Sequence, residues 1–318
     1  MVWTLFLSLN FSTSNNNPSQ PKAMASLKEV RSRITSIIST QQITKAMKMV
    51  AAAKLRRAQD NIIQMRPYAR KLSEMLSTVA AGAEMAGESP YNQVRPVEKV
   101  LLIVVTSDRG LAGAFNTNVV KEALVLINER YAEQNRRGNV EILAIGKKGA
   151  EAFQRRGYKV NTNFVNTFLS LSFAKVRTAA EEVMAAFTAG QYDRVDVIFN
   201  EFKNVATQVI RSEQFLPIVS AATHSATKAN NVNYIFEPSE EEIITELIPK
   251  TLKIQLYKAV LESNASEHGA RMTAMDKATE NAGDLLKELK LVYNRTRQAA
   301  ITKEILEIVG GAEALAQQ

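Results

Sequence analysis

The chain has 318 residues, of which 46% are hydrophobic, 23% charged and only 7% aromatic, so it carries enough apolar material for a folded core. Thirteen glycines and eight prolines are few for this length, which permits long helices and excludes collagen-like repeats and turn-rich β-sandwiches. With no cysteine and two histidines, the sequence excludes disulfides, thiolate zinc sites, cysteine nucleophiles and imidazole-rich metal sites.

Residues 1–23 combine a short apolar run with a Ser/Asn/Pro-rich stretch and have no basic residue before Lys22. Secretory signals and transit peptides carry basic residues in such a segment. A regular helical pattern begins soon after Met24. We therefore interpret residues 1–23 as a start-site artefact, the alternative being a disordered extension. Further along, the longest apolar stretches, such as Val100 to Val105, fall far short of the ~20 residues of a membrane-spanning helix.

Residues 24–81 contain no glycine and a single proline, Pro67, which favours one long helix. Ser26 and Glu29 form an S-x-x-E capping box at its start. An apolar stripe follows, with spacings of three and four residues: Leu27, Val30, Ile34, Ile37 and Ile38. Alanines at positions 46, 51, 52 and 53 permit close approach of a partner helix.

A second long helical region occupies residues 239–318. Its pattern runs from Pro249 to Val309, where Gly310-Gly311 predicts the end of the helix. A heptad repeat marks the expected apolar seam: Leu285, Val292, Ala299 and Leu306. Two such helices at opposite ends of one chain predict an antiparallel coiled coil.

The central region, residues 95–220, alternates strands and helices and predicts a Rossmann-like α/β domain inserted into the coiled coil. Its expected strands are Val100–Val105, Val140–Ile145, Val195–Phe202 and Thr207–Phe215. Its expected helices cover residues 117–134, 147–156 and 173–189. The predicted fold class is α/β, with this domain between the two coiled-coil helices.

The loop after the first strand, TSDRGLAGAFN (Thr106 to Asn116), lies where α/β proteins bind ligands. It matches neither the P-loop pattern nor the dinucleotide pattern. We interpret its glycines as turn residues, with Asp108 and Arg109 fixing the turn by hydrogen bonds. A small-molecule α/β enzyme stays a second possibility that rests on this loop alone.

Other ionisable groups favour solvated positions. An acidic run near Pro238 suits a loop and a helix N-terminus better than paired catalytic carboxylates. Its members are Glu237, Glu240, Glu241, Glu242 and Glu246. His224 and His268 stand singly in polar surroundings, and we expect both at the surface.

The first helix concentrates positive charge. Residues 24–81 hold eleven Lys or Arg and three acids, and 11 − 3 = +8 equals the formal net charge of the whole chain. Such a helix suits nucleic acid, an acidic protein surface or simple solvation. A basic coiled-coil nucleic-acid-binding protein is therefore one open alternative.

Three long motifs resemble one family. ITKAMKMVAAAKLRRAQ (Ile43 to Gln59) and LVYNRTRQAAITKEILEIVGGAEAL (Leu291 to Leu315) closely resemble the terminal motifs of the gamma subunit of F-type ATP synthase. TSDRGLAGAFN resembles its central-domain motif. The resemblance covers residues 24–315 in the family's order, and a split coiled coil around an α/β insert is also that family's architecture.

The resemblance implies a central rotor shaft without catalytic residues, cofactor or metal. The coiled coil stands inside a ring of alternating alpha and beta subunits, where nucleotides are bound. The α/β domain rests on the epsilon subunit and on the membrane ring of c subunits. The implied location is peripheral, at the cytoplasmic face of the bacterial plasma membrane, with no nucleic-acid partner.

The resemblance also implies partner-contact residues. Arg297 and Gln298 match a hydrogen-bonding catch that engages a catalytic subunit, with Thr302 one turn further on. A facing stretch of the first helix lies near an acidic lever of the ring: Lys45, Met47 and Lys48. An apolar tip held in the ring's upper sleeve corresponds to Ile305, Ile308 and Val309. Contacts of the α/β domain with other rotor subunits are expected within Val195 to Phe215.

The sequence departs from the family's chloroplast members, which carry a cysteine-containing regulatory insert in the central domain. This chain has neither cysteine nor an obvious insert, which indicates a bacterial enzyme without thiol switching. The segment before Met24 has no counterpart in the family pattern.

Overall fold

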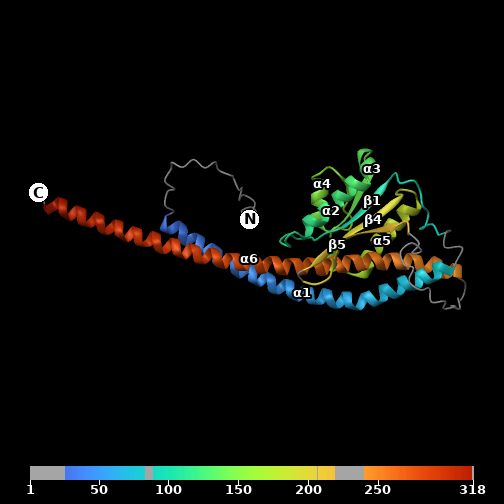
Figure 1. Ribbon diagram of the computed structural model, residues 1–318, viewed down its shortest axis with the longest axis horizontal. Helices are drawn as coiled ribbons and strands as arrows, with labels where there is room; N and C mark the ends of the chain where they lie inside the picture. The colour runs from blue at the N-terminus through green and yellow to red at the C-terminus, as the bar shows by residue number, and fades with distance from the viewer. Residues whose placement is uncertain (1–25, 83–88, 206, 219–239, 317–318) are drawn as a thin grey trace. The chain divides into compact units, whose positions relative to one another are not determined.

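A computed structural model describes residues 26–82, 89–205, 207–218 and 240–316 (Figure 1). Residues 1–23 and His224 lie outside these ranges, as does Glu237. The chain divides into two compact units that we describe separately. One unit comprises residues 1–40 and 282–318, and the other comprises residues 41–281.

A five-stranded sheet of order β3-β2-β1-β4-β5 forms the centre of the larger unit. The strands are β1 (Val100–Val105), β2 (Val140–Ile145), β3 (Lys159–Asn161), β4 (Arg194–Phe202) and β5 (Gln208–Leu216). The first four are parallel, and β5 pairs antiparallel to β4. Every residue of β1 is buried, as the continuous apolar run predicts for a central parallel strand.

Helices cover both faces of the sheet. These are α2 (Phe115–Arg130), α3 (Ala132–Arg136), α4 (Lys147–Gln154) and α5 (Phe173–Thr188), with a short 3-10 turn η2 (Thr167–Ser170) before α5. Val119 and Phe153, from α2 and α4, pack with Ile198 of β4 on one face. Val183 and Phe187 of α5 pack with Val197 on the other. The domain is thus a three-layer α/β structure, and the predicted fold class is confirmed. The sequence did not predict β3 or η2, and it predicted one helix over 117–134 where the structure has α2 and α3.

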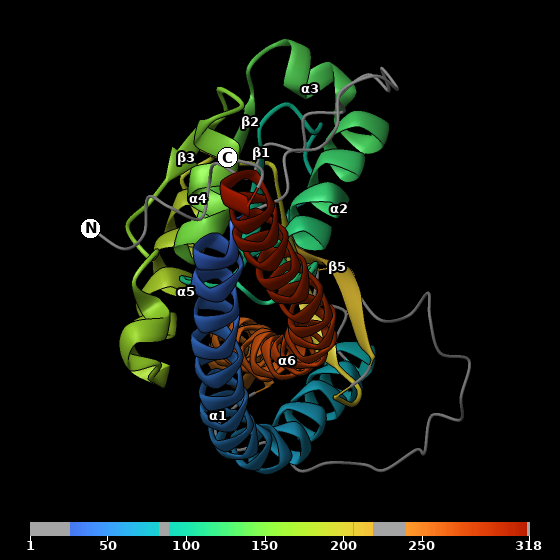
Figure 2. The same cartoon turned by 90° about the vertical axis from the view of Figure 1, so that its left-hand side faces the viewer.

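Two long helices complete the fold: α1 (Leu27–Gly82) and α6 (Glu240–Ala316). Within the larger unit they run antiparallel, because Gln41 contacts Thr279 while Arg66 contacts Glu262. Figures 1 and 2 both show them side by side there. A seam of small and aliphatic side chains in α1 faces Leu261 and Ala265 of α6: Leu55, Ala58 and Ile62. Before this stretch α6 lies on the α5 face of the sheet, where Leu252, Leu256 and Val260 are buried.

The smaller unit contains the first turns of α1 and the last part of α6. Ser26 caps α1 by accepting a hydrogen bond from the Glu29 backbone N–H at 3.2 Å, as expected of the capping motif. Of the predicted stripe in α1, Val30 is buried and Leu27, Ile34 and Ile37 are half-buried.

The heptad predicted in α6 is on the wrong face. Leu285, Val292 and Leu306 are 42, 44 and 66% exposed, and Ala299 is exposed too. The side chains that are buried or half-buried follow alternate spacings of four and three residues: Ala282, Leu286, Leu289, Tyr293 and Thr296. Residues seven apart lie on the same side of a helix whichever side is considered. The predicted heptad therefore has the right period but lies on the exposed side of α6.

The helix extends beyond both limits of the predicted pattern, Pro249 and Val309. The helix begins at Glu240 and continues through Pro249, because burial of Ile248 and Leu252 on the sheet holds this turn in place despite the missing backbone donor. It continues past Gly310-Gly311 to Ala316. Neither of these glycines adopts the positive φ of a helix-terminating cap, so they are ordinary helical residues here.

Candidate functional site

The last described turns of α6 form an exposed helix. Every residue from 297 to 313 is exposed. The stretch nevertheless carries large apolar side chains, including Ile305, Ile308 and Val309, which are 55, 71 and 49% exposed. A helix that exposes this much apolar surface is typical of a segment that another protein covers.

Arg297 and Gln298 open this exposed stretch, and Thr302 follows one turn later. Within the described residues, the Arg297 and Gln298 side chains make no hydrogen bond or ion pair, while Thr302 Oγ1 donates to the Gln298 carbonyl at 2.9 Å. The structure therefore brings together six of the residues that the resemblance singled out, on one unpartnered segment.

The predicted contact residues of α1, Lys45, Met47 and Lys48, are less exposed as a group than the end of α6. Lys48 Nζ forms an ion pair with Asp276 Oδ1 of α6 at 2.5 Å, so it takes part in the coiled coil itself. Next to it, Thr279 Oγ1 donates to Thr44 Oγ1 at 2.8 Å, and Gln41 reaches the Thr279 carbonyl at 3.4 Å. Lys45 points outward and is exposed, while Met47 is half-buried. Of the three residues predicted on α1, Lys45 is therefore the most accessible to a partner protein.

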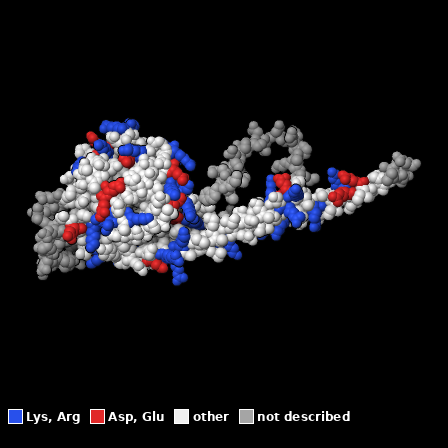
Figure 3. All heavy atoms as spheres, turned by 180° about the vertical axis from the view of Figure 1, so that it is seen from behind, with Lys and Arg blue, Asp and Glu red and all other residues white. Residues whose placement is uncertain are grey.

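The excess positive charge of α1 is partly neutralised by neighbours. Arg33 pairs with Glu29 at 2.8 Å, and both Arg70 and Lys71 lie within 4 Å of Glu74. On the face shown in Figure 3, acidic side chains lie among the basic ones over the α/β part and along the helices. This mixture of charges is typical of a solvated coiled-coil surface and differs from the continuous basic stripe of a nucleic-acid-binding protein.

An ion pair with a buried carboxylate joins the two long helices to the sheet, and the sequence analysis did not single it out. Arg66 of α1 donates to both carboxylate oxygens of Glu262 on α6, at 2.8 and 2.9 Å, and to the Phe202 carbonyl at 2.8 Å. The Glu262 carboxylate also accepts the Phe202 backbone N–H at 3.0 Å, and its side chain is only 2% exposed. One carboxylate thus links α1, α6 and the end of β4. An acid within the otherwise apolar face of α6 was the available signal.

The loop from Thr106 to Asn116 is held rigidly. Asp108 Oδ1 accepts the Lys147 backbone N–H at 3.2 Å, and Gly113 has a φ of +57°, as the turn interpretation expects. Arg109 acts differently from expectation, because its backbone carbonyl accepts a hydrogen bond from Arg271 of α6 at 3.1 Å. Burial raises the pKa of the Asp108 carboxyl. The loop is thus fastened to α6 and is not arranged as a phosphate cradle.

His268 of α6 is a further correction, since it is half-buried instead of lying free at the surface. Burial, with the nearby charges of Arg271 and Lys54, lowers its pKa to about 4. Arg271 Nη1 lies 3.4 Å from His268 Nδ1 and 2.5 Å from Glu267 Oε1. Burial also raises the pKa of Glu267.

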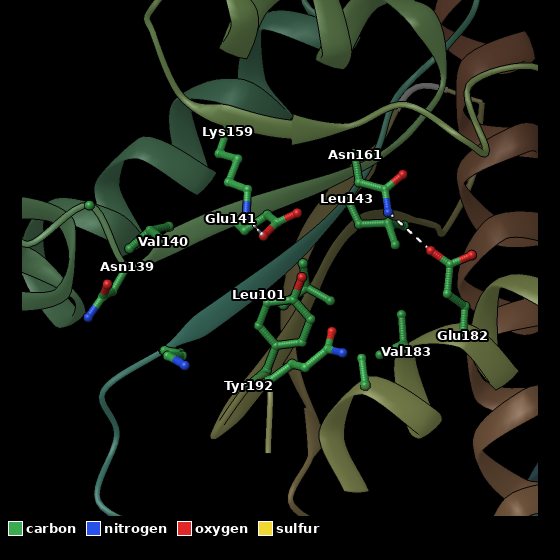
Figure 4. A pocket seen from close by; sticks show the side chains of 14 residues that line it. Leu101, Asn139, Val140, Glu141, Leu143, Lys159, Asn161, Glu182, Val183 and Tyr192 are labelled. Atoms are coloured by element: carbon green, nitrogen blue, oxygen red, sulfur yellow. Dashed lines mark hydrogen bonds and ion pairs between the residues drawn. The ribbon is translucent and has the colours of Figure 1, made fainter. Parts of the chain in front are cut away.

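A cavity of about 500 Å³ near the amino ends of β1 and β2 offers no catalytic arrangement (Figure 4). Four of its polar side chains are already engaged with each other: Lys159 pairs with Glu141 at 2.9 Å, and Asn161 donates to Glu182 at 3.1 Å. Among the described residues there is no cluster of three potential metal ligands, and none of the helices is long and apolar enough to cross a membrane.

Comparison with known proteins gives one answer. A family model described as ATP synthase matches residues 26–315. The ATP synthase gamma chain of Cytophaga hutchinsonii is 63% identical over 296 residues, which cover 92% of this chain and 99% of that relative. The gamma chain of Chloroherpeton thalassium is 51% identical, with the same coverage.

Solved structures agree with the fold. The central stalk and c-ring structure of the Tetrahymena thermophila mitochondrial ATP synthase contains a chain with 26% identity and a TM-score of 0.51; the match covers 74% of this chain and 99% of that one. A chain of the Euglena gracilis mitochondrial enzyme, 20% identical, matches 91% of this chain and 94% of its own length with a TM-score of 0.60, which supports the fold alone. The nucleic-acid alternative gains no support. The chain belongs to the ATP synthase gamma-chain family, as a non-catalytic subunit that forms the central shaft of the enzyme.

Proposed function

We propose that the shaft couples ion-driven rotation of a membrane ring of c subunits to conformational changes at catalytic sites in a surrounding ring of alpha and beta subunits. Either protons or sodium ions can drive such a ring. The α/β domain would sit with the epsilon subunit on the c ring, peripheral to the cytoplasmic face of the bacterial plasma membrane. The gamma-chain identity and the central-stalk neighbours support this assignment.

The main support for the proposal is that residues 297–313 form a helix whose side chains, apolar and polar alike, are left exposed by the described residues. Ile305, Ile308 and Val309 suit a sleeve that surrounds the shaft, because apolar contacts have no preferred direction and permit turning. Arg297 and Gln298 supply directional hydrogen bonds that form in some rotary positions and break in others.

On α1, Lys45 supplies an outward charge for an acidic segment of the ring, and Met47 and Lys48 flank it. Lys48 has a second role in the coiled coil through Asp276. As the shaft turns, such a charge faces one subunit of the ring after another. In each position it stabilises a particular conformation of the subunit that it faces, so a non-catalytic chain can govern catalysis.

The test uses the assembled enzyme with Arg297→Ala or Gln298→Ala. Loss of one charge-assisted hydrogen bond corresponds to about 1.4 kcal/mol or more, so we expect coupled ATP turnover to fall about tenfold. Arg295→Ala is the matched control, because Arg295 is exposed on the same helix two residues earlier. If all three variants assemble and turn over ATP at the same rate, Arg297 and Gln298 do not form a hydrogen-bonding contact that matters for coupling.

A further inference from the structure

A stripe of buried and half-buried side chains in α1 changes from polar to apolar within the larger unit. Its members recur at alternate spacings of three and four residues, as in a coiled-coil seam: Gln41, Thr44, Lys48, Ala51, Leu55, Ala58 and Ile62. The last four are apolar, whereas the first three, in succession, are polar. Aliphatic side chains at these three positions would bury more apolar surface. The polar residues therefore cost stability and need another explanation.

Each of the three polar positions is joined to α6. Lys48 Nζ lies 2.5 Å from Asp276 Oδ1. The hydroxyl oxygens of Thr44 and Thr279 are 2.8 Å apart, and Thr44 is only 8% exposed, so this contact is largely shielded from water. Gln41 Nε2 donates to the Thr279 carbonyl at 3.4 Å. We call these five residues the polar layer. Its hydrogen bonds are directional, so they restrict where α1 lies around α6.

A second polar connection between the same helices lies further along α1. Arg66 follows Lys48 by 18 residues, or about 27 Å along the helix, and binds Glu262. Between the two connections, no hydrogen bond or ion pair joins α1 to α6 among the described residues, and the seam consists of apolar contacts. Apolar contacts have no preferred direction. With Arg66 alone, α1 would be held at one end of this stretch and could roll across α6 at the other.

We propose that the polar layer keeps α1 from rolling around α6 when the shaft carries torque. Torque on a pair of helices displaces one helix around the other, and two directional connections about 27 Å apart make the pair turn as one body. Polar residues in a coiled-coil seam fix the relative position of helices at a cost in stability. The proposal rests on the shaft function and adds positioning residues to it.

The test measures a distance in the full-length chain. Ala46 of α1 and Lys277 of α6 are exposed, and the sequence has no cysteine, so Ala46→Cys with Lys277→Cys takes exactly two spin labels. With the polar layer intact, we expect one narrow distribution of label-to-label distances by pulsed electron spin resonance. Adding Thr44→Val, Lys48→Met and Thr279→Val should make the distribution at least about twice as wide. The urea midpoint of unfolding should not fall, because both hydroxyls are replaced by apolar groups of the same shape.

A charge exchange tests the ion pair of the layer separately. Lys48→Asp or Asp276→Lys alone sets like charges against each other and should widen the distribution. The two substitutions together restore opposite charges and should narrow it again. Arg33→Met is the matched control, since it removes an ion pair with Glu29 that lies within α1, and it should leave the distribution unchanged.

Three results would overturn the proposal: a distribution in the triple variant as narrow as in the native chain, widening that comes only with a lower urea midpoint, or a charge exchange no narrower than its single variants. The Lys48 and Asp276 side chains are 40 and 59% exposed, so the exchange keeps the test informative if the triple variant fails to fold. The measurement needs no partner subunit, so its failure would leave the shaft function standing.

Discussion

At the scale of single residues, the Arg66–Glu262 pair links α1, α6 and the end of β4. Glu262 is buried and bonded to two elements, whereas the Arg66 side chain is 45% exposed. The two partners are therefore unequal. Removing Arg66 leaves a buried carboxylate without its cation, while a neutral amide in place of Glu262 still accepts the Phe202 N–H.

We accordingly expect Arg66→Met to lower the free energy of unfolding by about 3–5 kcal/mol, and Glu262→Gln to lower it by about 1–3 kcal/mol. Urea denaturation of the full-length chain at pH 7 measures both. Equal costs, or a cost below about 1 kcal/mol for Arg66→Met, would show that the pair is screened by water and holds little of the structure together.

His268 makes stability depend on pH. Its folded pKa of about 4 lies below the value of 6.5 for an exposed histidine. Between these values the unfolded chain binds a proton that the folded chain does not, so stability falls as the pH drops from 6.5 toward 4. Glu267 acts in the opposite sense, because its raised pKa keeps the folded carboxyl protonated to higher pH.

Replacing His268 by Gln removes only the first effect. From pH 7.5 to 4.5, the native chain should lose on the order of 3 kcal/mol more than His268→Gln, as measured by urea denaturation at each pH. Parallel stability profiles for the two chains would mean that His268 titrates normally in the folded state.

At the scale of elements, the seam of the smaller unit can be tested by two adjacent leucines of α6. Leu286 is half-buried and Leu285 is 42% exposed. Leu286→Ala should cost about 1–2 kcal/mol, and Leu285→Ala less than about 0.5 kcal/mol. Hydrogen exchange of residues 282–296 in the isolated chain reports local opening of this unit. Faster exchange in Leu285→Ala than in Leu286→Ala would show that Leu285 lies in the buried seam, as the heptad pattern predicted.

These elements also show what the sequence could establish. Val100–Val105 is a strand with the predicted bounds, because six consecutive apolar residues have few other solutions. The three-residue strand β3 carries no such signal, since its side chains are exposed or half-buried and only pairing with β2 defines it. Periodicity could not show which face of α6 packs against α1. Apolar residues in the exposed stretch of α6 repeat with the same spacing as those in its buried seam.

At the scale of the whole molecule, the three motifs identified the family. They lie on the α1 helix, on the loop after β1 and on the exposed end of α6. The Leu291–Leu315 motif falls mostly on the exposed part of α6, where the described residues give its side chains little cover. The Thr106–Asn116 motif falls on a loop fastened to α6 by Arg271. Exposure shows that this part of α6 is uncovered by the described residues but does not show which side chain meets which partner, so the roles of Arg297 and Gln298 remain predictions.

The central claim, that this chain turns as a shaft, is tested most directly by observing rotation. The sequence has no cysteine, so Arg137→Cys, at an exposed position after α3, gives a unique attachment point for a bead on the α/β domain. With the catalytic ring fixed to a surface and ATP supplied, we predict stepwise rotation of the bead in one direction, with longer pauses in Arg297→Ala. A bead that stays still while the complex hydrolyses ATP would contradict the shaft function.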